Sequence, residues 1–140
     1  MTENRLSEPE FKVTPDQEKE LGKLRHIIDT APMRKALACG AAGALTFGGI
    51  VYMCEGSALY AGVVALIFGW GGIQLGALSG CAKANRAYRR ACEIIIDTSD
   101  YKKLTAGRTS MYEARHMGLE KHKISDPQDI VRDMCIPKGV

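Results

Sequence analysis

The chain has 140 residues and a formal net charge of +3, with 19 Lys and Arg against 16 Asp and Glu. This length accommodates one small domain and leaves little room for a second. Hydrophobic residues make up 46% of the chain, but they are concentrated in two uncharged runs, 36–54 and 56–82, that only Glu55 separates. This distribution is not typical of a soluble enzyme.

Residues 1–35 form a polar segment in which we expect one amphipathic helix. Thr14 is placed as the N-cap, Pro15 as the first helical residue and Gln17 as the partner that closes a capping box. The apolar spacing predicts a helix to about Asp29, lying on the membrane or on the hairpin's own tail; specific docking to a partner is the alternative. Its apolar face comprises Leu21, Leu24 and Ile28.

The two uncharged runs are long enough to cross a membrane as helices. Residues 36–54 number 19 and residues 56–82 number 27, which as helices reach roughly 28 and 40 Å. A bilayer core is about 30 Å thick, so the longer run crosses by tilting or by extending past the interface. The rest of the chain offers no comparable apolar surface to cover two buried helices. We therefore predict a transmembrane hairpin with a basic helical extension at 36–97.

The outer flanks of the hairpin are basic and its connecting loop is acidic, so both ends are expected in the same compartment. Helix is expected to continue past the second run to about Ile96, since no Gly or Pro falls between Cys81 and Asp97. This extension is predicted to contact lipid head groups or a partner, and to act as a stop-transfer anchor or an internal import signal. Its basic residues are Lys83, Arg86, Arg89 and Arg90.

Small residues recur along one side of each predicted span, and they form ridges on which another helix can approach closely. Phosphate-binding loops need a preceding strand and usually Gly-Lys-Ser/Thr, which this sequence lacks. The ridges are expected to contact each other, a partner, or both, and self-association is possible. The ridge residues are Ala36, Gly40, Ala44 and Gly48 in the first span and Ala61, Ala65, Gly69, Gly72, Gly76 and Gly80 in the second.

No arrangement of residues indicates catalysis, a cofactor or a metal. The five cysteines show no Cys-x-x-Cys spacing, and the three histidines share no ligand spacing with them. Cys39 and Cys81 are expected at similar depth, facing each other, as small reduced apolar residues or as a disulfide or metal pair. We expect that the protein is not an enzyme. Nucleic acid is not an expected partner, because the basic residues cluster at a membrane edge.

Residues 98–140 are expected to form a polar tail that is helical, partly disordered and without a core of its own. Ser110 with Glu113 predicts a capped helix to about His122, and Asp126 with Pro127 a last short helix to about Met134. The predicted fold is therefore all-α: a two-helix transmembrane hairpin with an N-terminal amphipathic helix and this helical tail.

The stretch from Asp29 to Arg90 combines the segment APMRK, the spaced glycines of CGAAGALTFGG, and Cys81 followed by a basic helix. It resembles a twin-span family of mitochondrial inner-membrane assembly chaperones, which escort newly made subunit 2 of cytochrome c oxidase. The resemblance implies a multi-pass inner-membrane protein with both termini in the intermembrane space. It also implies that the protein binds that subunit and presents it to insertion factors and metallochaperones.

Three other classes remain open at this point. The Thr-Pro-acidic start TPDQE is also similar to the OCIA-domain proteins of mitochondria and endosomes, which have two spans. A structural, supernumerary subunit of a respiratory or ATP-synthase complex is the second alternative. The third is a membrane-shaping hairpin that associates with itself through its glycines.

Overall fold

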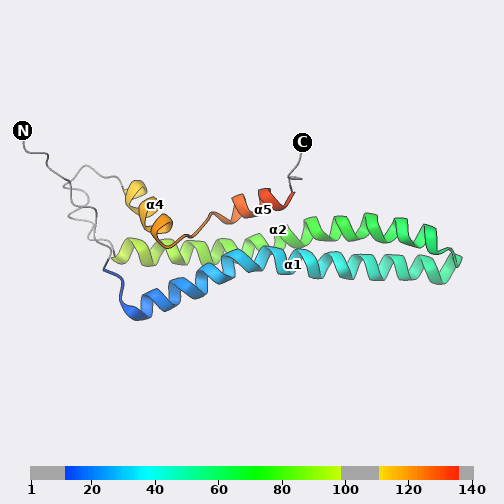
Figure 1. Ribbon diagram of the computed structural model, residues 1–140, viewed down its shortest axis with the longest axis horizontal. Helices are drawn as coiled ribbons and strands as arrows, with labels where there is room; N and C mark the ends of the chain where they lie inside the picture. The colour runs from blue at the N-terminus through cyan, green and yellow to red at the C-terminus, as the bar shows by residue number, and fades with distance from the viewer. Residues whose placement is uncertain (1–11, 99–110, 136–140) are drawn as a thin grey trace, which may run out of the picture.

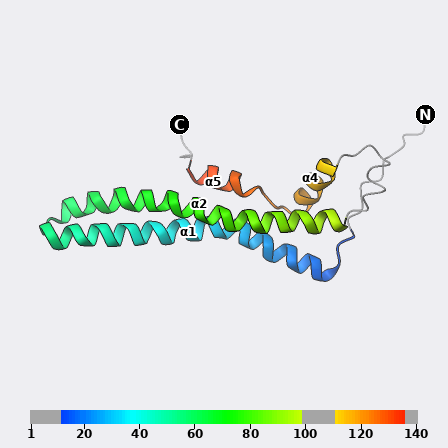
Figure 2. The same ribbon diagram turned by 180° about the vertical axis from the view of Figure 1, so that it is seen from behind.

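The computed structural model describes residues 12–98 and 111–135, which are helical and contain no strand. Two long helices, α1 (Pro15–Glu55) and α2 (Ala58–Thr98), form an antiparallel hairpin. Two short helices, α4 (Met111–Lys121) and α5 (Pro127–Cys135), lie beside the half of the hairpin that contains its open end (Figures 1 and 2). The prediction of an all-α hairpin is confirmed.

Local hydrogen bonds define both ends of α1. The Thr14 side chain accepts from the backbone N–H of Gln17, and the Gln17 side chain accepts from the N–H of Thr14, which is the predicted capping box. At the other end Gly56 adopts a left-handed conformation with φ of 67° and donates its N–H to the Tyr52 carbonyl at 2.9 Å. Ser57 then leads directly into α2, so the turn of the hairpin is very short.

The prediction that the first helix ends near Asp29 is wrong, because α1 continues through Pro32 to Glu55. The expected boundary at residue 35 therefore falls inside one helix. Proline lacks the N–H that would bond the carbonyl four residues earlier, and it kinks a helix without necessarily ending it. Figure 1 shows α1 bending between its blue and cyan parts, and Pro32 is the proline inside this helix. The ring is fully buried against α2, and this packing stabilises the continuous helix.

The large apolar side chains of the core lie at the open end of the hairpin, opposite the turn. We call this charged end of the two helices the polar end. Leu21 and Ile28 of α1 are buried with Ala91 and Ile95 of α2, so the predicted apolar face of the first segment packs on the hairpin's own extension. The tail contributes Leu119 and Ile124 to the same cluster. The described part of the tail thus shares the hairpin's core.

The two tail helices begin and end close to their predicted limits. α4 ends at Lys121, one residue before the expected end, while Ser110 lies outside the described residues. α5 is capped by Asp126, whose Oδ1 accepts from the N–H of Gln128 at 2.8 Å. The expected disorder falls partly on 99–110 and 136–140, which also lie outside the described residues.

Leu119 tests how the tail is held. Replacing this buried side chain with Ala removes apolar contact and leaves a cavity, which should cost about 2–4 kcal/mol of docking free energy. We expect amide protons of α4 to exchange faster in Leu119→Ala. The matched control is Met117→Ala on the same helix, whose side chain is 37% exposed. Equal exchange in the two variants would contradict the shared core.

Candidate functional site

The small-residue ridges of α1 and α2 face each other along the hairpin. The contact buries residues that carry no large side chain, for example Ala36, Gly40, Gly48 and Gly76. All ten predicted residues are buried or half-buried. Seven are buried: Ala36, Gly40, Gly48, Ala61, Gly69, Gly76 and Gly80; three are half-buried: Ala44, Ala65 and Gly72.

The two backbones approach so closely that several of these glycines have no room for a side chain. A Cβ atom on Gly72 would lie 2.5 Å from the Cys39 carbonyl oxygen. One on Gly80 would lie 2.6 Å from Pro32 Cα. Within a bilayer, where little hydrophobic force holds helices together, such close contact is a main source of helix association.

The contact extends further than the sequence analysis predicted. Ala84, Ala87 and Ala91 continue the ridge of α2 after Gly80, and each is at most 7% exposed. Their spacing of four, three and four residues is the helical period that identified the glycines. The signal was therefore present, but it falls in a stretch whose basic residues indicated an interface rather than a core.

The contacts also show which parts of the two helices lie at the same level. Gly76 packs on the backbone of Lys35 and Ala36, and the short turn begins at Glu55. Residues 36–54 therefore lie beside 58–76, and each stretch of 19 residues is about 28 Å long. The remainder of the longer uncharged run extends past the level of Lys35. Equal lengths near 30 Å suit a hairpin that crosses a bilayer without strong tilt.

Apart from the ridges, this part of the hairpin exposes apolar side chains. Only 11% of the most apolar 18-residue stretch of α1 and 17% of that of α2 is buried, whereas core helices of soluble proteins are mostly buried. Tyr52 and Tyr60 lie near the turn, where aromatic side chains favour a membrane interface. We call this surface the apolar collar. Its large residues are Met33, Leu37, Leu45, Phe47, Ile50, Tyr52, Met53, Leu59, Tyr60, Val63, Leu66, Ile67, Phe68, Trp70, Ile73, Leu75 and Leu78.

The expectation that Cys39 and Cys81 face each other is wrong. The Cys39 backbone packs against Gly72, whereas Cys81 follows Gly80, which packs on Pro32. Cys81 is thus nine residues beyond the level of Cys39, or about 13 Å along the axis, and a disulfide requires Cα atoms within about 7 Å. Both thiols are free.

The predicted basic residues have different surroundings. Arg90 lies 3.3 Å from Glu20 of α1 and 3.3 Å from Glu93, so it joins the two helices at their polar end. Lys83, Arg86 and Arg89 are exposed, and no ion pair involves them within the described ranges. The structure therefore separates Arg90 from the other three.

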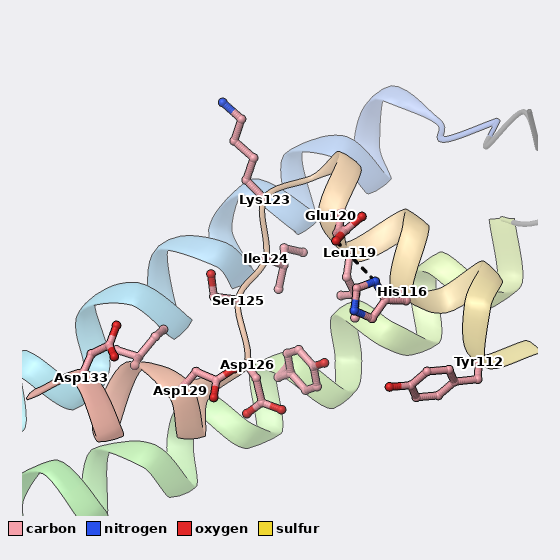
Figure 3. Close-up of a pocket in the computed structure, with 12 residues that line it drawn as sticks. Tyr112, His116, Leu119, Glu120, Lys123, Ile124, Ser125, Asp126, Asp129 and Asp133 are labelled. Carbon is pink, nitrogen blue, oxygen red and sulfur yellow. Dashed lines mark ion pairs between the residues drawn. The ribbon is translucent and has the colours of Figure 1, made fainter. Parts of the chain in front are cut away.

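An open cleft of about 630 Å³ lies between α4, α5 and α2. Figure 3 shows Tyr112 and His116 of α4 on one side and Asp126 and Asp129 on the other. His116 Nδ1 is 3.5 Å from Glu120, and Asp129 is 2.9 Å from Arg132. These acids therefore form local pairs and caps, and the described residues contain no group of three ligands suited to a metal.

Burial affects two titratable groups beside this cleft. It raises the pKa of the Cys92 thiol and of the Tyr88 hydroxyl above their ordinary values, because the charged forms lose hydration. Both groups are therefore protonated at neutral pH. A thiol in this state is a poor nucleophile.

No protein-family model, no curated protein and no solved structure matches this chain.

Gly40→Leu tests the close contact of the ridges. A Cβ there would lie 2.5 Å from Ile73 Cγ1 and 3.1 Å from the Gly69 carbonyl oxygen, so the helices must separate. We expect the free energy of unfolding, measured by thermal unfolding in detergent micelles, to fall by about 1–3 kcal/mol, as for overpacked cores. Gly49→Leu is the control, because nothing lies within 4 Å of its Cβ position. It gains the same helix propensity. A stable Gly40→Leu hairpin would overturn the close contact.

Cys92 offers a pH-dependent test of the polar-end core. In a variant whose other cysteines are replaced, alkylation should be slow at about pH 7 and should accelerate only above the ordinary thiol pKa of about 8.5. Adding Leu119→Ala should accelerate the reaction, because it opens the cluster that contains both residues. Rapid alkylation at neutral pH in the parent variant would show that Cys92 is not buried.

Proposed function

We propose that this protein is an assembly chaperone of the mitochondrial inner membrane that binds newly made subunit 2 of cytochrome c oxidase before its insertion and copper metallation. The client, the compartment and the orientation toward the intermembrane space rest on the resemblance of residues 29–90. The closed hairpin supports an escort role. Its ridges contact each other, so its membrane part is stable alone and its whole outer surface is available to a client.

The client-binding surface follows from this closure. Because the ridges are occupied, a client's transmembrane helix has to bind outside them. The outer side of α1 has the smallest exposed side chains of the hairpin's first span, and small residues allow the closest approach between helices. This surface comprises Ala38, Ala42, Thr46 and Gly49, with the exposed side chain of Leu45 beside them.

The test measures how much labelled client is recovered by variants of this outer surface of α1. Mitochondria that carry a tagged protein are pulse-labelled for organelle-encoded subunits and solubilised in detergent. The tagged protein should then recover the unassembled oxidase subunit. We expect Ala42→Leu with Gly49→Leu to lower this recovery several-fold without opening the hairpin. Gly62→Leu is the matched control, because this exposed glycine of α2 also has nothing within 4 Å of its Cβ position.

Other outcomes distinguish the competing functions. A structural subunit would persist one-to-one in the mature respiratory complex, whereas a chaperone is substoichiometric to it. A membrane-shaping hairpin would recover copies of itself and no labelled subunit, and outer-face variants would then alter membrane morphology. If the double variant recovers as much labelled subunit as the wild type does, the proposed binding surface is wrong.

A further inference from the structure

The apolar collar ends at the same level on both helices. Gly76 packs on Lys35 and Gly80 packs on Pro32, so Leu78 and Met33, the outermost large residues of the collar on their helices, lie at the same level along the axis. This level marks the expected edge of the hydrocarbon core at the polar end. A long basic side chain that starts at or just beyond this edge reaches the head-group layer, which is about 5–8 Å thick on each side of a bilayer.

Four basic residues lie at or just beyond this edge, two on each helix. The two of α1 directly follow Met33 on its membrane side, and the two of α2 lie beyond Leu78. All four are exposed, and no ion pair involves them in the part of the chain that the structure describes. Arg90, further from the edge, is held by Glu20 and Glu93. Bases near the edge thus lack the anionic partners that Arg90 has. We call these four residues the basic belt: Arg34, Lys35, Lys83 and Arg86.

The direction of helical side chains brings the belt to one layer. Side chains tilt toward the N-terminus of their own helix. Those of α1 therefore tilt outward, carrying Arg34 and Lys35 from about 1–3 Å inside the edge toward the head groups. Those of α2 tilt back toward the membrane. Lys83 lies five residues beyond Leu78, about 8 Å, and Arg86 about 12 Å, so both long side chains reach the same layer.

We propose that the basic belt binds the phosphodiester head groups of anionic phospholipids at the polar-end interface. Lys supplies a flexible point charge, and Arg supplies a planar fork that pairs with two phosphate oxygens. Bases from both helices contact the same lipid layer, so bound lipid also holds the register of α1 and α2. This inference does not depend on the identity of the client.

The experiment measures which lipids the protein retains. The full chain is reconstituted in nanodiscs of equal parts phosphatidylglycerol and phosphatidylcholine, released into detergent, and analysed by native mass spectrometry. We expect the wild type to retain phosphatidylglycerol preferentially. Replacing all four belt residues with Gln should lower the ratio of retained phosphatidylglycerol to phosphatidylcholine by about tenfold, since each base near an anionic surface contributes separately.

A variant with the same loss of charge separates a site from general attraction. Four exposed bases away from the edge are replaced with Gln: Lys12, Lys19, Lys23 and Lys123. This control should keep the wild-type ratio within about twofold, because screening limits attraction over such distances. An unchanged ratio in the belt variant, or an equal loss in both variants, would overturn the site.

Two further measurements keep the result decisive. If the fourfold variant does not fold, the α1 pair Arg34→Gln with Lys35→Gln and the α2 pair Lys83→Gln with Arg86→Gln are compared separately, and each should lower the ratio several-fold. Millimolar inorganic phosphate should not displace the retained lipid. Displacement would show that the belt binds free phosphate as readily as a lipid, and would overturn the assignment to the membrane.

Discussion

The close approach of the α1 and α2 backbones is the constraint on which the rest of the molecule depends. Gly72 and Gly76 lie against the backbone of Cys39 and Lys35, and these close contacts hold the two helices in their observed register. Apolar side chains alone would not determine this register, because lipid solvates the collar as well as another helix does. Small side chains hold the membrane part together, and the large ones remain on the outside.

This register determines where the charged residues and the apolar collar lie along the hairpin. Because Gly76 lies beside Lys35, the two helices leave the apolar region at the same level. The surplus length of the second uncharged run then becomes part of the polar end, where Ala84 and Ala91 extend the contact. The two uncharged runs differ in length by roughly 12 Å. This difference arises because α2 continues as one helix from the lipid-facing part into the polar end of the hairpin.

Much of this fold was predictable from local patterns. The capping box at Thr14 and the ridges have short-range spacings that helix geometry fixes, and they appear where expected. The continuation of α1 through Pro32 was not predictable, because burial against Gly80 stabilises a residue that is locally unfavourable in a helix. The levels of Cys39 and Cys81 depended on the pairing register, which no single-helix pattern contains. Long-range contacts therefore decided each wrong prediction.

The polar end explains why such a hairpin carries extra helices. Two helices alone bury little, and the cluster around Ile28 and Ile95 would be open to water on one side. Leu119 and Ile124 cover that side from the tail. The tail thus supplies apolar burial where water drives it, while the ridges supply close packing where lipid removes that driving force. Close backbone packing therefore stabilises the half of the hairpin that faces lipid, and burial of large apolar side chains stabilises the half that faces water.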